Sequence, residues 1–246
     1  MKKFTIDELN NIYVHKVKKD NSYFNKYKSM PPCPVKQWNN NWRGKDMPRN
    51  FAILDFIDWT KKYGIDIGDE LGITCNGDYE LEFINYKNKT LLEYPPHDLH
   101  IYYDKYHLKF DFFIFNQTIE HLYNPFMALE NIYNYIKPGG YVYTSVPTIN
   151  IPHMTPIHYN GYNPMGLALL FLSTGFEIIE IGQWGNFSYI SKLFERHRWP
   201  DATQVSHENE ERNVAQCWIL AKKPLKLEQK SKEYVDIYKD LLNFNV

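Results

Sequence analysis

The stretch "FDFFIFNQTIEHLYNP" constrains the fold more than any other part of this chain. Its first six residues are almost all apolar, and hydrogen-bonding side chains then follow at Asn116, Gln117, Glu120 and His121. A strand that is apolar on both faces is typical of a parallel sheet covered by helices on both sides. Ligands of such sheets bind beyond the carboxyl ends of the strands. The sequence therefore predicts a buried parallel strand that ends beside a binding crevice.

Strand and helix patterns alternate along the rest of the chain. Short apolar runs bounded by turn residues predict strands over residues 69–75, 89–94, 110–115, 141–147, 177–185 and 214–224. Apolar residues at helical spacing predict helices over residues 50–65, 81–88, 124–140, 163–176 and 227–244. Asn124 is expected to cap its helix, and Gly139 with Gly140 to end it. The alternation indicates an α/β sheet with helices on both faces.

The length of 246 residues suits one domain with additions, or at most two small domains. Residues 1–48 are polar and contain a Pro-rich turn region, which predicts an N-terminal extension that could fold over the site as a lid. Residues 49–224 are expected to form the main domain, and residues 225–246 an amphipathic C-terminal helix.

Charge and cysteine content narrow the class of protein. The formal net charge of -1 gives no electrostatic footprint for a nucleic acid, and no apolar run approaches the ~20 residues that span a membrane. The three cysteines form no C-x-x-C pair, which argues against a disulfide framework or a zinc site built from cysteines. No signal peptide is recognised at the N-terminus. A cytoplasmic, reducing location is therefore expected.

The segment from "FDFFIF" through "EHLYNP" to "LENIYNYIKPGGYVYTSVP" resembles the central block of class I S-adenosylmethionine-dependent methyltransferases, of the type 11/23-like group. The order and spacing of a strand, an EH pair, an Asn-Pro helix start, PGG and a later GFE carry the resemblance, which covers roughly residues 66–185 and the last strand. It implies a Rossmann-like, doubly wound and mostly parallel seven-stranded sheet, with S-adenosylmethionine as cofactor.

The resemblance also implies a cofactor loop after the first strand, where the family has an acidic residue, one further residue and then G-x-G-x-G. In "ELGITCNGD", Glu70 and Gly72 match this pattern, Thr74 replaces the second glycine, and Gly77 comes one place late. Glycines in such loops let the backbone approach a ligand closely. Thr74 and Asn76 would crowd the methionine end of the cofactor unless the loop takes a different path.

Two further segments are implied to hold the nucleoside part of the cofactor. Glu93 follows the second strand, and its carboxylate could accept hydrogen bonds from both ribose hydroxyls. The alternative is a solvated glutamate at a strand end. Asp98 matches the polar residue near the adenine amino group, with Leu99 giving a backbone N–H or an apolar contact. Asp98 could equally be a turn residue after Pro-Pro.

By the same resemblance, Asn116 and Gln117 lie below the methyl donor and face the acceptor, and His121 lines the cofactor or braces the loop. The alternative is that Glu120 and His121 cap the following helix.

The loop "TINIPHMTPIHYNGYNP" follows the strand at 141–147 and is rich in His and Tyr. In the family this loop faces the acceptor, and histidine titrates near neutrality, which suits a base. His153 or His158 is expected to take the acceptor proton, and either could instead be a hydrogen-bonded loop residue. No metal is predicted, because no acidic residue lies near these histidines in sequence.

Aromatic residues outside this loop are weaker candidates for contact with the acceptor. Trp184 and Tyr189 follow a predicted strand, and Trp38 and Trp42 lie in the N-terminal extension. Each could stack on a flat acceptor, although such rings more often belong to the core.

The leading hypothesis is a methyltransferase that modifies a small molecule, preferably at a hydroxyl of a sugar or nucleotide-sugar. A methyltransferase-like binding module without the cofactor is the alternative that the altered glycine loop suggests. A nucleic-acid methyltransferase is disfavoured by the neutral charge. The oligomeric state is left open, with a homodimer among the options.

Overall fold

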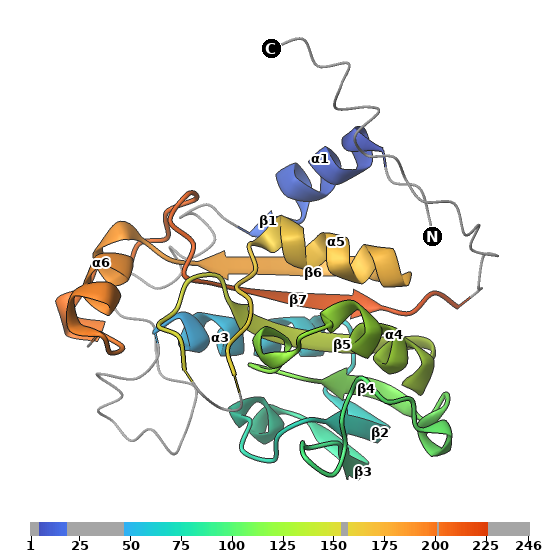
Figure 1. Ribbon diagram of the computed structural model, residues 1–246. Coiled ribbons are helices and arrows are strands. Elements are labelled where there is room, and N and C mark those ends of the chain that lie inside the picture. The colour runs from blue at the N-terminus through green and yellow to red at the C-terminus, as the bar shows by residue number, and fades with distance from the viewer. Residues whose placement is uncertain (1–4, 19–46, 154–156, 201, 226–246) are drawn as a thin grey trace.

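The structure is a computed structural model that describes residues 5–18, 47–153, 157–200 and 202–225 (Figure 1). Trp38 and Trp42, residues 1–4 and 19–46 of the possible lid, and the helix predicted over residues 227–244 lie outside the described residues. Within the described chain, one sheet of seven strands forms the centre of the molecule, in the order β1-β6-β7-β5-β4-β2-β3.

Seven strands and several helices make up the described chain. The strands are β1 Val17–Lys18, β2 Ile67–Ile73, β3 Asn85–Leu91, β4 Phe110–Ile114, β5 Ile136–Pro147, β6 Glu177–Trp184 and β7 Gln216–Lys222. The α-helices are α1 Ile6–His15, α3 Met47–Lys62, α4 Pro125–Tyr135, α5 Pro164–Thr174 and α6 Phe187–Arg196. Short 3-10 helices are η2 Tyr79–Phe83, η3 Asp104–Tyr106, η4 Ile119–His121 and η5 Ala202–Gln204.

Strand directions confirm the predicted doubly wound sheet. β7 runs antiparallel to β5 and β6, and every other neighbouring pair is parallel. The chain passes from β2 to β3 at one edge and then returns to place β4 on the other side of β2. Strand order therefore reverses at β2, which is the kind of switch point where ligands of such sheets bind.

Helices cover both faces of the sheet, as predicted (Figure 1). Residues of α4 and α5 pack into one hydrophobic core, which partly buried residues of α1 also touch. Residues of α3 and α6 pack into a second core on the opposite face. The Asn-Pro helix starts are confirmed, because Asn124 accepts a hydrogen bond from the Met127 amide and Asn163 accepts one from the Gly166 amide.

The helix predicted over residues 81–88 is wrong. A single 3-10 turn ends at Phe83, and β3 begins at Asn85 and pairs in parallel with β2. Tyr86 explains the outcome, because its ring lies over Gly68 of β2 and its hydroxyl donates to the Ile65 carbonyl at 2.9 Å. Pairing across the sheet thus overrides the local helical pattern.

The helix stop predicted at Gly139 and Gly140 is also wrong. α4 ends at Tyr135, and the chain continues directly into β5, so both glycines lie in a strand. Gly139 has a φ of 83°, and its amide donates to the Lys223 carbonyl at 2.8 Å. The positive φ, which glycine adopts without strain, accompanies the hydrogen bond to the chain after β7.

The seventh strand comes from the region predicted as an N-terminal extension. β1 pairs in parallel with β6 at the edge of the sheet, through Val17 opposite Ile181 and Lys18 opposite Gly182. The strand has only two residues, which is too short for an alternating pattern of apolar residues to predict it from the sequence.

A buried carboxylate on β6 fastens the end of α3 to the sheet. Glu180 accepts from Lys62 Nζ at 2.5 Å and from the Tyr63 hydroxyl at 2.6 Å, and Lys18 Nζ lies 3.5 Å away. Burial raises the pKa of Glu180, but the hydrogen bonds from Lys62 and Tyr63 outweigh it, so that the pKa lies below its usual value. The ionised form is therefore the one that the fold stabilises.

We predict that Glu180→Gln lowers the free energy of unfolding by about 1 kcal/mol at pH 7, a modest loss because Lys62 is largely exposed to solvent. A carboxyl with a lowered pKa stabilises the fold above its unfolded pKa of about 4.3 and loses this effect as the pH falls through the folded value. Urea unfolding should show that the difference in unfolding free energy between the wild type and Glu180→Gln is smaller at pH 3.5 than at pH 7. Glu177→Gln, at an exposed position of the same strand, is the control, and a difference of constant size would contradict the prediction.

Candidate active site

A cavity of about 920 Å³ opens beyond the carboxyl ends of β2, β3 and β4. Its walls come from the residues that directly follow these strands, from η4, and from the loop after β5. The volume lies within the range of ~300–1,000 Å³ that small-molecule and cofactor sites occupy. The cavity therefore occupies the switch point of the sheet, as the sequence predicts.

Most of the predicted cofactor residues meet in this cavity. Those that line it are Thr74, Gly77, Glu93, Asp98, Leu99, Asn116, Gln117 and His121. Glu70 and Gly72 are not among the lining residues. The Glu70 carboxylate accepts from Asn88 Nδ2 at 2.7 Å on β3, and a Cβ at Gly72 would lie 2.2 Å from the Phe113 ring. Gly72 thus allows close packing of β2 against Phe113.

Contacts of Thr74 and Cys75 hold the loop after β2. The Thr74 amide donates to the Ile114 carbonyl at 3.2 Å, and the Thr74 and Thr118 hydroxyls lie 3.0 Å apart. The buried Thr74 side chain is thus held against the segment that follows β4. The Gly77 amide donates to Cys75 Sγ at 3.3 Å, which closes a tight turn.

The wall after β3 combines a carboxylate with apolar side chains. Glu93 is exposed at this wall, while Leu92 and Leu99 are buried there. Asp98 Oδ1 accepts from the His100 amide at 2.9 Å and lies 2.7 Å from His100 Nδ1. Burial raises the pKa of Asp98, but these bonds to His100 outweigh it and leave the pKa lowered. Asp98 is therefore also a turn residue, as the alternative interpretation has it.

Asn116 and Gln117 follow the end of β4 and line the cavity. Asn116 is 2% exposed, and its Oδ1 accepts from the Ser145 amide at 2.9 Å. Its Nδ2 has no hydrogen-bond partner among the described residues. Gln117 has a φ of 46°, and strain of this kind concentrates at functional sites. A buried donor at the wall of a cavity fits a bound ligand that supplies the acceptor.

Arg49 of α3 lines the cavity and is a residue that the sequence analysis missed. Its Nη2 donates to Asp78 Oδ1 and to Glu80 Oε2, each at 3.0 Å, and all three side chains are largely or fully buried. Burial and the Glu80 charge raise the pKa of Asp78 to about 7, against the opposing effect of Arg49. Arg49 precedes the first predicted helix and carries no local motif, so no sequence signal points to it.

Three histidines come together beside the cavity. The ring centroids of His121 and His153 are 4.9 Å apart, those of His153 and His158 are 4.9 Å apart, and those of His121 and His158 are 6.0 Å apart. His121 lines the cavity, whereas His153 and His158, in the loop after β5, are not among its lining residues. The two predicted catalytic histidines are thus neighbours, and His121 joins them.

The predicted bracing role of His121 agrees with the geometry. His121 Nδ1 lies 3.0 Å from the Ile157 carbonyl, and the Tyr159 amide donates to the Glu120 carbonyl at 2.8 Å. These bonds dock the loop after β5 on η4. The capping alternative is wrong, because Asn124 caps α4.

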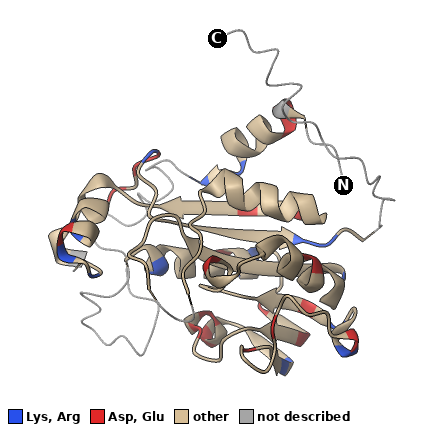
Figure 2. Ribbon diagram, viewed as in Figure 1, with Lys and Arg blue, Asp and Glu red and all other residues tan. Residues whose placement is uncertain are grey.

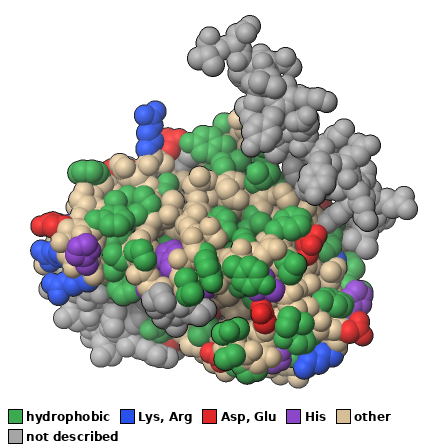
Figure 3. Space-filling view, in the orientation of Figure 1, with side chains coloured by type: hydrophobic (Ala, Val, Ile, Leu, Met, Phe, Trp, Pro, Cys, Tyr) green, Lys and Arg blue, Asp and Glu red, His purple; other side chains and the backbone are tan. Residues whose placement is uncertain are grey.

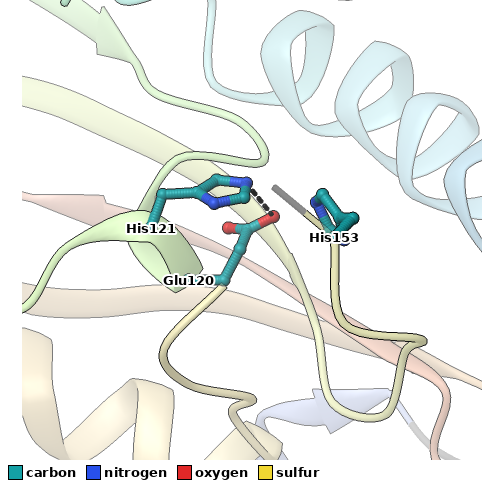
Figure 4. Close-up of side chains that lie close together, drawn as sticks. All are labelled: Glu120, His121 and His153. Atoms are coloured by element: carbon teal, nitrogen blue, oxygen red, sulfur yellow. Dashed lines mark ion pairs between the residues drawn. The ribbon is translucent and has the colours of Figure 1, made fainter. Parts of the chain in front are cut away.

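The Glu120 carboxylate is fully buried and points toward His121 and His153 (Figure 4). Its Oε1 lies 3.9 Å from His121 Nε2. The expectation of no metal rested on the lack of acidic residues near the loop histidines in sequence, and the fold brings Glu120 beside them.

Trp184 and Tyr189 belong to the core. Trp184 is 0% exposed and stacks on Phe51 of α3, and Tyr189 packs edge-on against Trp184. Neither ring lines the cavity, so the core interpretation of these aromatic residues holds.

We predict that Arg49→Met lowers the free energy of unfolding by about 3 kcal/mol, because Asp78 and Glu80 would then be buried side by side without the cation that bonds both. Chemical denaturation of the variant at pH 7 measures the loss. Adding Asp78→Asn and Glu80→Gln to the variant should restore much of it, since the two uncompensated charges are removed. A loss below about 1 kcal/mol, or no recovery in the triple variant, would contradict this account.

Solved structures similar to this chain include several methyltransferases. An S-adenosylmethionine-dependent methyltransferase from Archaeoglobus fulgidus is 14% identical, covers 70% of this chain and 94% of its own, and has a TM-score of 0.43. A phosphoethanolamine N-methyltransferase 2 from Haemonchus contortus, solved with S-adenosylmethionine, is 17% identical over 72% of this chain and 52% of its own, with a TM-score of 0.43. The [4+2]-cyclase SpnF is 15% identical over 77% and 86%, with a TM-score of 0.45.

No curated protein matches the chain. Among protein families, the one described as a methyltransferase domain matches residues 57–181, which is more than half of the chain. The match runs from within α3 to the middle of β6 and so contains β2, β3, β4 and the residues that follow them. The chain therefore belongs to this methyltransferase family, the class I fold whose cofactor is S-adenosylmethionine.

Proposed function

We propose that this protein transfers a methyl group from S-adenosylmethionine to a hydroxyl of a small molecule, preferably a sugar or nucleotide-sugar. The observation that carries the proposal is the cavity at the switch point of the sheet, where residues after three neighbouring strands converge. Such a cavity is where a Rossmann-like sheet binds a nucleoside cofactor.

The residues of the cavity fit the parts of this cofactor. Glu93 is an exposed acceptor at the end of β3, which suits two ribose hydroxyls. Leu92 and Leu99 give an apolar wall for the adenine ring. Asn116 Nδ2, the buried donor without a partner among the described residues, suits an acceptor atom of the methionine part.

When bound, the cofactor supplies a methyl group on a positively charged sulfur, which is already activated for in-line displacement. The chain has to align the acceptor oxygen, exclude water and take a proton. Tyr123, Ile157 and Tyr159 line the cavity and give it an aromatic and apolar rim for holding the acceptor. For the proton we propose the loop histidines, with His153 and His158 as the candidate bases.

Surface composition supports a small acceptor. Lys and Arg are interspersed with Asp and Glu over the described elements, so this view shows no extended basic face (Figure 2). Hydrophobic side chains, with histidines between them, gather on the face seen in Figure 3. Not one of the described helices has the length and apolar character needed to cross a membrane.

The alternative of a binding module that has lost the cofactor is favoured by one feature. Thr74 stands where the family has a glycine, and its buried side chain faces Thr118 across the loop. If this pair narrows the methionine end of the cavity, the cofactor would not enter. Titration with the cofactor product separates the two hypotheses.

We predict that S-adenosylhomocysteine binds the purified full chain with micromolar affinity, and that Glu93→Ala weakens binding by roughly 10- to 100-fold, because a charged acceptor is worth ~1.5–3 kcal/mol. Isothermal titration calorimetry measures both. Glu82→Ala, at an exposed glutamate of η2 outside the cavity, is the matched control and should bind as the wild type does.

Absence of binding by the wild type would overturn the methyltransferase proposal and favour the binding module. Equal affinities of Glu93→Ala and the wild type would show that Glu93 does not contribute to cofactor binding. Micromolar binding would justify a screen of sugar and nucleotide-sugar acceptors for methyl transfer, and methylation of a sugar hydroxyl would support the preferred acceptor class.

A further inference from the structure

Glu120 is a buried carboxylate that the proposed transfer does not use. Its exposed fraction is 0%, and neither carboxylate oxygen has a hydrogen-bond partner among the described residues. Buried carboxylates in proteins are paired, hydrogen-bonded or bound to a metal. The neighbours of Glu120 therefore decide what its position means.

Hydrogen bonds to backbone carbonyls indicate which nitrogen of each histidine carries the lone pair. His121 Nδ1 lies 3.0 Å from the Ile157 carbonyl, and His153 Nδ1 lies 3.2 Å from the Ile151 carbonyl. Because a carbonyl only accepts, both protons are on Nδ1 and both lone pairs on Nε2. Metal-bound histidines are typically oriented in this way, with the second nitrogen donating to a carbonyl or carboxylate.

His158 completes this arrangement of protons. Its Nε2 lies 3.1 Å from the Asn160 carbonyl, which places the proton there and the lone pair on Nδ1. That Nδ1 lies 3.3 Å from His153 Nδ1 and can share its proton.

The three side chains are close enough to share one ion. One ring nitrogen of His121, one of His153 and one carboxylate oxygen of Glu120 all lie within 4.8 Å of one another. Ligand atoms around a tetrahedral zinc ion are about 3.4 Å apart, given bonds of about 2.1 Å. A contraction of up to about 1.4 Å between ligand atoms, through side-chain rotation, would close the site around an ion.

We propose that Glu120, His121 and His153 form a binding site for one divalent transition-metal ion of the zinc class. Two imidazoles and one carboxylate are a ligand set that zinc and related ions bind, with a further position left open. The loop after β5 brings His153 to η4, and its backbone bonds to the Glu120 carbonyl hold the two segments together. The site is thus built from two segments that the fold fixes against each other.

The position of the site gives the ion a use. His121 also lines the cavity, so the open position would face the acceptor end of it. A cation there would lower the pKa of an acceptor hydroxyl. This use rests on the proposed function, whereas binding of the ion does not. With the ion bound, His153 would be a ligand, and His158 would remain as the candidate base.

The test is a metal titration of the full chain, purified without a histidine tag, treated with a chelator and desalted. We expect one equivalent of Zn²⁺ to bind with micromolar or tighter affinity by calorimetry. Co²⁺ should give visible absorption bands of a low-coordinate site. His153→Ala and Glu120→Gln should each weaken Zn²⁺ binding at least tenfold, because losing even an outer partner of a metal ligand costs about 10- to 100-fold.

His197→Asn is the matched control, because His197 is exposed at the end of α6 with a φ of 49°, a conformation that asparagine tolerates. This variant should bind Zn²⁺ as the wild type does. Thermal unfolding followed by circular dichroism checks that each variant is folded. If Glu120→Gln unfolds, His153→Ala, in a partly exposed loop, still tests the site.

Two results would overturn the metal site: no Zn²⁺ binding by the folded wild type, or equal binding by His153→Ala and the wild type. Titration with S-adenosylhomocysteine in the presence of chelator keeps the two proposals apart. Cofactor binding without Zn²⁺ binding removes the metal site and leaves the methyltransferase proposal standing. Zn²⁺ binding without cofactor binding supports the metal site and removes the methyltransferase proposal.

Discussion

Burial of β4 on both faces is the constraint from which the site follows. Phe112 packs into the core on the α3 side, and Phe113 packs into the core on the α4 and α5 side. Gly72 of β2 makes room for the Phe113 ring. A shift of one residue would exchange the two faces, so the register against β2 and β5 is strongly specified. The point where β4 ends, and with it the position of Asn116, is fixed by this packing.

The polar cluster after β4 has two structural tasks. It ends the strand by bonding to β5, since Thr144 Oγ1 donates to the Phe115 carbonyl and the Gln117 amide donates to the Ser145 carbonyl. It also borders the cavity, because Asn116, Gln117 and Thr118 are among the lining residues. An apolar strand is therefore followed by hydrogen-bonding residues, because these residues both form hydrogen bonds with β5 and line the cavity.

Sequence reasoning succeeded where a residue's environment is decided by its near neighbours in the chain. The Asn-Pro helix starts need only one turn of backbone, and the places of Glu93 and Asn116 at the cavity wall need only the end of their own strand. It failed where distant segments decide the outcome. β3 forms because Tyr86 packs on Gly68, β1 forms because β6 offers an edge, and Arg49 reaches the cavity from a helix that precedes every strand lining it.

Glu120 is visible in the sequence as part of the EH pair, but its environment is set by a distant segment, the loop after β5. Its backbone carbonyl accepts from the Tyr159 and Asn160 amides, which joins η4 to the loop that carries His153, and its side chain is fully buried. An ionised carboxylate held in this way without a partner is costly. A proton would remove the charge but would leave the imidazole lone pairs beside it unused. A metal ion would satisfy the carboxylate and both imidazoles together, which is the physical reason to expect one where a buried acid meets two histidines oriented by carbonyls.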